Sequence, residues 1–378
     1  MIEFLLELPS NQFIALCIIS GTLLIQLVYY LLVYGKVIYK RNRKIDHILN
    51  EPVSVIICAK NEEQNLRKFL PVVLEQNYSN FEVIVVNDCS QDDSEMYLAE
   101  LEQTHKNLRH TTIETDNKFR HGKKLAVTIG IKSAKNNYLV FTDADCVPAS
   151  PNWLQEIMNA YTEKTEMVLA YGKYKKTKGL LNRIVRFDTF MIGLQYLGMA
   201  LLRSPYMGVG RNLSYKKDFF FAGKGFGNHY HILSGDDDLF INEHSNRNNT
   251  SVAIAKESIT ESVPPATFME WIKQKKRHLS TAKYYKLTNK LVLGLEPVSK
   301  LAFYLVLIYL CFTPIYYIAI GIYLFRLLMQ LIIIKIGMNK LTEKGFLLLI
   351  PFLDIFLPIF QLTLMLANKI NTKKSKWK

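Results

Sequence analysis

Apolar segments near the two ends of the chain restrict its fold more than any other feature. Residues 12–34 contain no charged side chain, and at a helical rise of about 1.5 Å per residue they can cross a hydrocarbon core of about 30 Å. Glu3 and Glu7 precede this segment, where a secretory signal peptide would carry positive charge, and no small-residue cleavage site follows it. We therefore predict a retained membrane-spanning anchor.

Basic residues lie beside the apolar segments and predict the orientation of the chain. They form three clusters: Lys36, Lys40, Arg41, Arg43 and Lys44; Lys273, Lys275, Lys276 and Arg277; and Lys373, Lys374, Lys376 and Lys378. The formal net charge is +14, but no stripe of interleaved basic and aromatic residues accompanies it, so anionic lipid explains the clusters better than nucleic acid. We expect the apolar segments to lie in a bacterial-type cytoplasmic (inner) membrane. The positive-inside rule then places the centre of the chain in the cytoplasm.

The C-terminal apolar region leaves the number of spans open. One stretch covers residues 301–338, interrupted by Pro314, Arg326 and Gln330, and another covers 346–366. Three crossings would place the basic loop at 335–344 inside and the lysine-rich tail outside, whereas two crossings would do the reverse. We expect two or three spans.

The centre of the chain alternates short apolar runs with segments of helical periodicity. Apolar runs lie at 53–58, 81–86 and 138–142, and helical patterns at 61–76, 94–105 and 124–133. This alternation predicts an α/β domain with a largely parallel sheet. Ligands of such sheets bind beyond the carboxyl ends of the strands.

Polar clusters occupy the predicted strand ends. Lys60-Asn61-Glu62, Asn87-Asp88 and Asp143-Ala144-Asp145 follow three apolar runs, without a GxGxxG or GxxxxGK[ST] pattern of a dinucleotide or P-loop site. Two carboxylates around one residue can direct oxygen ligands at a hard cation such as Mg²⁺ or Mn²⁺, although a solvated turn is the alternative. The five cysteines show no CxxC spacing, which argues against a zinc site or redox pair.

These motifs resemble the membrane-bound, inverting family 2 glycosyltransferases, which have the GT-A fold and include processive polysaccharide synthases. The resemblance covers residues 52–286 and implies that Lys60, Asn61 and Glu62 cradle the donor nucleoside. It further implies that Asp88 accepts a hydrogen bond from a uracil base, with Asn87 where the family usually has a second Asp. In His121-Gly122-Lys123-Lys124, Lys123 and Lys124 would approach the donor, although a charged helix start is the alternative.

The same resemblance assigns the chemical groups. Asp143 and Asp145 would hold the divalent cation, with Asp145 the more direct ligand, and Gly210, Arg211 and Asn212 would line the acceptor side. In Ser234-Gly235-Asp236-Asp237-Asp238, Asp237 would be the base, with Asp236 or Asp238 as alternatives. Crowded like charges raise one pKa, as a base requires.

Residues 267–270 form a capping-box pattern that predicts a helix. Gln274, Arg277 and His278 would share a face of this helix. Polymer-forming members have Gln-x-x-Arg-Trp here, so Arg277 can bind the leaving diphosphate while His278 stands where the acceptor platform would be, and processive synthesis is in doubt. Alternatively, the helix lies on lipid through Phe268, Trp271, Ile272 and Leu279.

The resulting expectation is a Rossmann-like GT-A catalytic domain flanked by transmembrane helices. Its parts are an anchor at 1–45, a catalytic domain at 46–263, an interfacial region at 264–298 and a transmembrane region at 299–378. It would transfer sugar from a nucleotide-sugar donor, with UDP-sugar preferred, to a lipid-linked or glycan acceptor, using Mg²⁺ or Mn²⁺. A processive synthase and a catalytically silent membrane scaffold are the alternatives.

Overall fold

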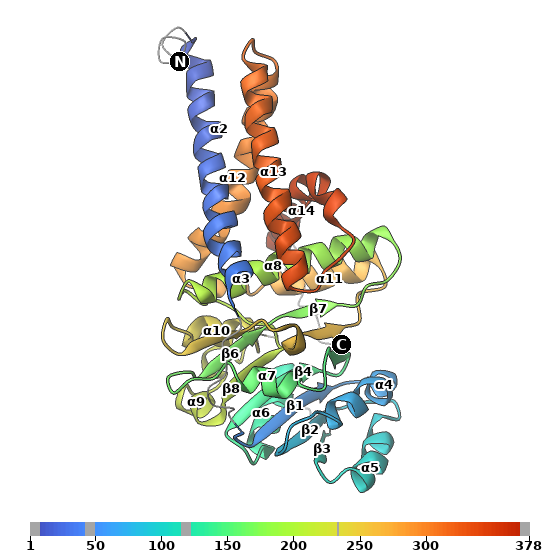
Figure 1. The fold of residues 1–378 in the computed structure, drawn as a ribbon. Coiled ribbons are helices and arrows are strands. Elements are labelled where there is room, and N and C mark those ends of the chain that lie inside the picture. The colour runs from blue at the N-terminus through green and yellow to red at the C-terminus, as the bar shows by residue number, and fades with distance from the viewer. Residues whose placement is uncertain (1–7, 42–49, 115–121, 233, 371–378) are drawn as a thin grey trace. The chain divides into compact units, whose positions relative to one another are not determined.

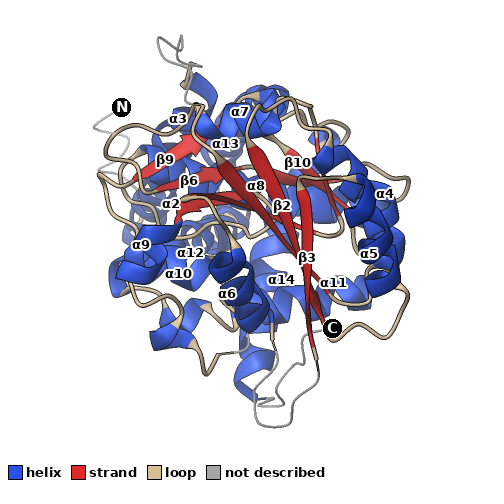
Figure 2. Ribbon diagram, turned by 90° about the horizontal axis from the view of Figure 1, so that it is seen from below, coloured by secondary structure: helices blue, strands red, loops and turns tan. Residues whose placement is uncertain are grey.

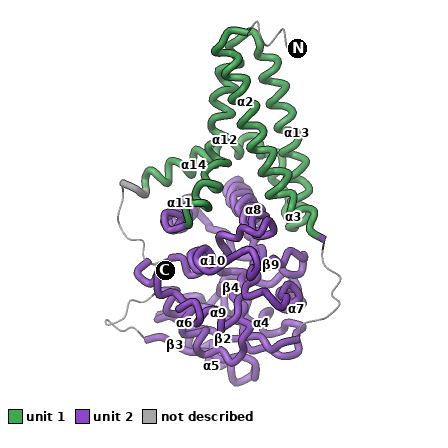
Figure 3. The backbone as a smooth tube through the Cα atoms, turned by 90° about the vertical axis from the view of Figure 1, so that its left-hand side faces the viewer, with its two compact units in different colours: residues 1–40, 286–371 green, residues 41–285, 372–378 purple. Residues whose placement is uncertain are grey.

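The computed structural model describes residues 8–41, 50–114, 122–232 and 234–370. Arg43, Lys44, His121 and the basic tail at 373–378 lie outside the described residues. The chain divides into two compact units (Figure 3). Residues 1–40 and 286–371 form one, the helical unit, and residues 41–285 and 372–378 form the other, the α/β unit.

A seven-stranded sheet forms the core of the α/β unit (Figure 2). Its strands, in spatial order, are β3 (Leu108–Ile113), β2 (Phe81–Asp88), β1 (Val53–Ala59), β4 (Tyr138–Asp143), β8 (Leu213–Lys216), β6 (Met167–Ala170) and β9 (Thr250–Ala253). Only β8 runs antiparallel to its neighbours β4 and β6. The predicted largely parallel sheet is therefore confirmed.

Helices cover this sheet because their apolar residues recur at helical spacing. They are α4 (Glu63–Leu74), α5 (Ser94–Thr104), α6 (Lys123–Ser133) and α7 (Trp153–Met158). In α4, Leu66, Leu70 and Val73 are buried in the core over β1 and β2. Gly130 lets α6 lie close to the sheet, because a Cβ there would come within 2.6 Å of Ile56 Cγ2. This close packing positions the first turn of α6 at the carboxyl ends of the strands.

A three-stranded sheet and further helices complete the α/β unit. The sheet has the order β5 (Cys146–Pro148), β10 (Thr260–Ser262) and β7 (Gly172–Tyr174). The helices are α8 (Leu180–Leu201), α9 (Lys217–Ala222), α10 (Asp238–His244) and α11 (Phe268–Leu279), with 3₁₀ turns η2 (Gly227–His229), η3 (Lys256–Ser258) and η4 (Ala282–Tyr284). The predicted capping box is present at Thr267 and Glu270. However, Trp271 is buried, so the expectation that it faces lipid is wrong.

The helical unit contains four helices long and apolar enough to span a membrane among the described residues (Figure 1). The first is continuous over Ser10–Tyr39 and consists of α2 (Ser10–Val28), a π-helical segment η1 (Tyr29–Tyr34) and α3 (Gly35–Tyr39). The others are α12 (Leu287–Cys311), α13 (Tyr316–Lys340) and α14 (Ile350–Ile370), with the 3₁₀ turn η5 (Leu347–Leu349) before α14. Because α12 already begins at Leu287, the expected interfacial region at 264–298 is divided between the two units.

A buried polar network links the helices of this unit. Arg326 on α13 donates to Asp354 of α14 at 2.5 Å and to Gln26 of α2 at 2.5 Å. On α12, Lys300 lies 2.8 Å from Glu296 and 3.4 Å from Asp354. In lipid such groups must satisfy one another, so these pairs favour one fixed arrangement of the helices. In Figure 3, α14 runs sideways, across the direction of α2, α12 and α13.

Candidate active site

The loops after β1 and β2 are tied together at the carboxyl edge of the sheet. The backbone N–H of Asn61 donates to Ser90 Oγ at 2.9 Å, and the N–H of Gln91 donates to Asn61 Oδ1 at 2.7 Å. Asn61 adopts a φ of 54°, a conformation that asparagine tolerates better than most residues. Next to it, Glu62 accepts a hydrogen bond from Asn65 at 2.6 Å. The polar cluster at 60–62 therefore has a fixed conformation at the carboxyl edge of the sheet.

Two buried polar atoms lie at the end of β2. Asn87 and Asp88 are fully buried, and Asn87 donates to Glu95 at 2.7 Å. Asn87 Oδ1 and Asp88 Oδ2 have no hydrogen-bond partner among the described residues. An unsatisfied buried acceptor costs about 1–3 kcal/mol, so this pair is suited to a ligand that donates hydrogen bonds, as the edge of a nucleobase does.

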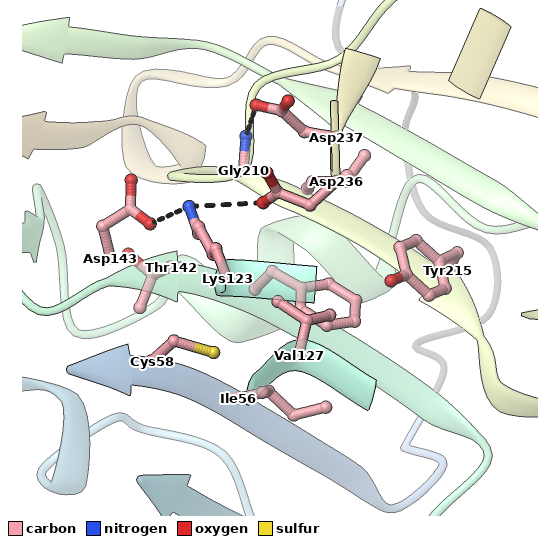
Figure 4. Close-up of a pocket in the computed structure, with 12 residues that line it drawn as sticks. Ile56, Cys58, Lys123, Val127, Thr142, Asp143, Gly210, Tyr215, Asp236 and Asp237 are labelled. Atoms are coloured by element: carbon pink, nitrogen blue, oxygen red, sulfur yellow. Dashed lines mark hydrogen bonds and ion pairs between the residues drawn. The ribbon is translucent and has the colours of Figure 1, made fainter. Parts of the chain in front are cut away.

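Lys123, the first residue of α6, joins two carboxylates from distant parts of the chain (Figure 4). Its Nζ lies 2.8 Å from Asp143 Oδ1 and 3.4 Å from Asp236 Oδ2. Burial opposes its charge, but Asp143, Asp236 and Asp237 outweigh burial and hold the pKa of Lys123 well above its usual value. Lys123 is therefore a permanent cation in the pocket.

Lys124 is placed away from this pocket. Its Nζ donates to the backbone carbonyls of His229 at 2.6 Å and Ile232 at 3.1 Å. Burial lowers its pKa to about 8. The structure thus brings Lys123, and not Lys124, to the acidic residues, and Lys124 instead fixes the segment before the three aspartates.

The turn after β4 has the ligand chemistry of a hard-cation site. Asp143, Asp145 and Cys146 each offer a ligand atom, and these atoms all lie within 4.8 Å of one another. Burial raises the pKa of Asp143, but Lys123 and then Arg211 and Arg277 outweigh it, so the net pKa is lowered. The pKa of Asp145 is raised by burial and by Asp143. Carboxylate oxygens suit Mg²⁺ or Mn²⁺, and burial keeps the Cys146 thiol protonated by raising its pKa.

The three consecutive aspartates differ in their contacts. Asp236 and Asp237 line the pocket with Lys123, Asp143 and Gly210. Asp237 Oδ2 accepts from the Gly210 N–H at 2.8 Å, and burial followed by Asp236 raises its pKa. Asp238 is instead the first residue of α10, and its Oδ2 accepts from Tyr285 at 2.7 Å and also from Thr281. The structure therefore leaves Asp236 and Asp237, but not Asp238, facing the pocket.

Basic residues surround the turn at Asp143. The Arg211 guanidinium lies 4.5 Å from the ring centroid of Tyr174, and the Tyr174 hydroxyl accepts from Gln274 at 2.7 Å. Arg277 is partly buried and His278 is exposed. Gln274 of α11 thus contacts Tyr174, and Arg277 of the same helix is close enough to lower the pKa of Asp143.

Asn212, expected on the acceptor side, belongs to the core. Its side chain is fully buried, accepts from Trp153 Nε1 at 3.1 Å and donates to the carbonyls of Tyr171 and Ser258 at 2.8 Å each. All of its hydrogen-bonding capacity serves the protein. The structure therefore separates Asn212 from its neighbours Gly210 and Arg211.

Residues 54–227 match the family described as Glycosyl transferase family 2. These residues are therefore a family 2 glycosyltransferase domain. An uncharacterized glycosyltransferase of Haemophilus influenzae is 32% identical over 155 residues, which are 41% of this chain and 44% of that protein. A poly-beta-1,6-N-acetyl-D-glucosamine synthase of Staphylococcus epidermidis is 30% identical over 104 residues, 28% of this chain and 24% of that protein.

The fold of this glycosyltransferase domain is GT-A, as expected. The mannosyltransferase PcManGT of Pyrobaculum calidifontis, solved in complex with GDP-Man and Mn²⁺, superimposes with a TM-score of 0.56 and 17% identity. The match covers 88% of this chain and 99% of that one. The chain spans less than half the length of the first curated relatives that it matches.

Several residues of the glycosyltransferase domain were not predicted from the sequence. Tyr174 contacts both Arg211 and Gln274, and Ser262 donates to Asp145 Oδ2 at 3.2 Å. Tyr215 lines the pocket. These residues do not belong to a polar sequence motif. Their positions in short strands are the only sequence signal that could have predicted them as site residues.

Proposed function

We propose that this protein is an inverting glycosyltransferase that moves a sugar from a nucleotide-sugar donor to a lipid-linked or glycan acceptor at the cytoplasmic face of a membrane. One observation carries this proposal: within a family 2 domain, Lys123 joins Asp143 of the DxD turn to Asp236, the neighbour of Asp237, inside one pocket. A cation-binding turn and a candidate base thus lie close enough to act on one substrate.

The donor is proposed to be a UDP-sugar. The unsatisfied oxygens of Asn87 and Asp88 are suited to the N–H edge of a uracil, and Lys60, Asn61 and Glu62 form the adjoining wall. The relative in Staphylococcus epidermidis is named as a synthase of an N-acetylglucosamine polymer, which supports this choice. GDP-Man, present in the complex of PcManGT, is the competing donor.

Asp145 and Asp143 are proposed to hold a divalent cation. Their clustered oxygens fit a hard cation, and a bound Mg²⁺ or Mn²⁺ would neutralise the diphosphate. Ser262 holds the Asp145 carboxylate in place. Lys123 and Arg277 add fixed positive charge where negative charge develops on the leaving group.

The proposed chemistry is a single in-line displacement. Asp237 accepts the proton of the acceptor hydroxyl while the oxygen of that hydroxyl forms a bond to the anomeric carbon. The bond between that carbon and the diphosphate breaks, and the nucleoside diphosphate takes the electron pair. The raised pKa of Asp237 makes it a stronger base than an ordinary aspartate.

The acceptor side is assigned to Gly210 and Arg211. Asn212 is left out because its amide is engaged in the core. His278 replaces the tryptophan of polymer-forming members and is exposed, which supports single transfer to a lipid-linked acceptor over repeated transfer.

Purified full-length protein, incubated with membrane lipid extract and Mn²⁺ or Mg²⁺, should consume one labelled UDP-sugar from a panel that includes UDP-N-acetylglucosamine, UDP-glucose and GDP-mannose. Excess EDTA should abolish turnover. Consumption of GDP-mannose alone would show that the proposed donor is wrong, and no turnover of any donor would contradict the function. A ladder of product lengths would favour the processive alternative.

A further inference from the structure

The loop between β7 and α8 carries a concentrated positive charge on the surface of the α/β unit. Lys175, Lys176 and Lys178 follow directly on β7, and all three are exposed. Arg183 on the first turn of α8 is also exposed. Leu180, which begins α8, is 57% exposed, so the basic residues lie beside an apolar side chain that the protein leaves uncovered.

A buried side chain holds this loop in one conformation. Asn182 is 5% exposed; its Oδ1 accepts from the Thr177 N–H at 3.0 Å, and its Nδ2 donates to the Lys175 carbonyl at 3.0 Å. The lysines are therefore presented by an ordered loop.

A second exposed segment lies beside the first. The Lys175 N–H donates to the Ser262 carbonyl at 2.9 Å, because β7 and β10 are parallel neighbours. The chain after β10 leads into α11, whose first two residues, Phe268 and Met269, are 44% and 59% exposed.

A buried ion pair fixes the two helices to each other. Lys275 of α11 lies 2.8 Å from Asp188 of α8, about two turns into each helix. The two helices therefore pack against each other in the same unit, and they lie near each other in Figure 1.

We propose that these six residues, Lys175, Lys176, Lys178, Leu180, Phe268 and Met269, form a basic-apolar edge that binds the anionic phospholipid surface of the bilayer. Lysines around isolated apolar side chains are typical of interfacial binding, where the ammonium groups meet lipid phosphates and the apolar groups enter the headgroup boundary. Glu270, the acidic residue in the first turn of α11, has its carboxylate engaged at the helix start, where it accepts from the Ala266 N–H at 2.9 Å.

A bilayer is favoured over a protein partner because the same chain supplies four apolar helices, and α12 begins at Leu287, directly after the α/β unit ends at Tyr285. This placement also corrects the lipid-facing set expected from sequence. Trp271 is in the core, and the exposed apolar residues are those of the first turn of α11.

The edge adjoins the proposed active site. Tyr174, which contacts Arg211 and Gln274, is followed immediately by Lys175. Lipid bound to the loop therefore stabilises the strand end that positions Arg211 and Gln274, so donor turnover rises in an anionic bilayer. This consequence rests on the proposed function; lipid binding itself does not.

Full-length protein in nanodiscs tests both parts. Discs of phosphatidylcholine alone are compared with discs that contain phosphatidylglycerol, by amide hydrogen exchange of residues 175–183 and by donor turnover. We expect exchange to slow several-fold in the anionic discs, and to return toward the phosphatidylcholine value at high salt. The variant Lys175→Gln/Lys176→Gln/Lys178→Gln should lose this response, and so should Phe268→Ser/Met269→Ser in part.

The matched control is Lys132→Gln/Lys135→Gln/Lys164→Gln, which removes the same charge from exposed lysines elsewhere on the unit and should respond as wild type. Equal exchange in both kinds of disc, or an unchanged response in the loop variant, overturns the proposal. The same protection from soluble glycerophosphoglycerol in phosphatidylcholine discs also overturns it, because it would show a phosphate site and no need for a bilayer surface. Lipid-dependent protection without donor turnover supports the edge while contradicting the proposed function.

Discussion

At the scale of single residues, three adjacent aspartates have different environments because the chain turns into α10 at this point. Asp236 contacts Lys123, Asp237 accepts from the Gly210 N–H, and Asp238 accepts from Tyr285. Sequence adjacency therefore does not imply shared chemistry. Each environment predicts a different response to the same Asp→Asn change.

Asp237→Asn should reduce transfer by about 10²-fold to 10⁴-fold, because the amide cannot accept a proton. Donor affinity should change little, and added metal should not restore activity. Asp145→Asn should weaken donor and cation binding, with partial recovery at high Mn²⁺. Initial rates and calorimetric donor binding at several metal concentrations separate the two. Near-normal transfer by Asp237→Asn, with loss in Asp236→Asn, would move the base by one residue.

Asp238 should make stability depend on pH. Burial and then Asp237 raise its pKa to about 7, against the hydrogen bonds from Thr281 and Tyr285. A carboxyl with a raised folded-state pKa binds more protons when folded, so its contribution to stability falls as pH rises from about 4 to about 7. Asp238→Asn should therefore exceed wild type in Tm by a few degrees at pH 8, and the gap should close toward pH 5. Thermal scans of this variant and of the exposed control Asp218→Asn check this; an equal gap at every pH would contradict it.

At the scale of elements, helix packing decides what neighbouring residues do. Lys123 and Lys124 begin the same helix, yet one reaches Asp143 and the other the carbonyls at 229 and 232, because successive residues of a helix point about 100° apart. In the same way, Lys275 of α11 pairs with the buried Asp188, whereas its neighbour Gln274 donates to Tyr174 at the candidate active site.

The buried pair of Lys275 and Asp188 predicts a marked stability effect. Lys275→Met should lower the free energy of unfolding by about 3–5 kcal/mol, because it removes the ammonium that pairs with a buried carboxylate. Adding Asp188→Leu should recover most of that loss, since neither charge of the buried pair then remains. Thermal unfolding followed by fluorescence of the buried Trp153 and Trp271 measures both variants. A double variant as unstable as the single one would contradict this account.

At the scale of the whole molecule, the membrane helices suggest an arrangement that the sequence alternatives did not include. In Figure 3, α14 runs across the direction of α12 and α13, and its Asp354 is held by Arg326. If α12 and α13 cross and α14 lies in the plane of the membrane, both the basic loop at 335–344 and the basic tail lie inside. This satisfies the positive-inside rule at both places.

Cysteine labelling in a cysteine-free background tests this topology. In intact cells, a membrane-impermeant maleimide should label Thr313→Cys but should label Lys344→Cys, Thr162→Cys and Ser375→Cys only after permeabilisation. Labelling of Ser375→Cys from outside would show that α14 crosses the membrane, and labelling of Thr162→Cys would place the catalytic domain outside.

The sequence by itself determined the features that depend on the burial of continuous segments. Local periodicity and composition predicted four such features: the uncharged residues 12–34, the apolar runs of β1, β2 and β4, the turn at Asp143 and Asp145, and the capping box at Thr267. They could be predicted because the residues within a short segment set whether that segment is buried or solvated. The tertiary structure alone decided which distant groups meet. It brought Lys123 between Asp143 and Asp236, turned Asp238 toward Tyr285, took Asn212 and Trp271 into the core and placed Tyr174 beside Arg211. Strand order and helix packing set these contacts, and neither is encoded in the spacing of residues within one segment.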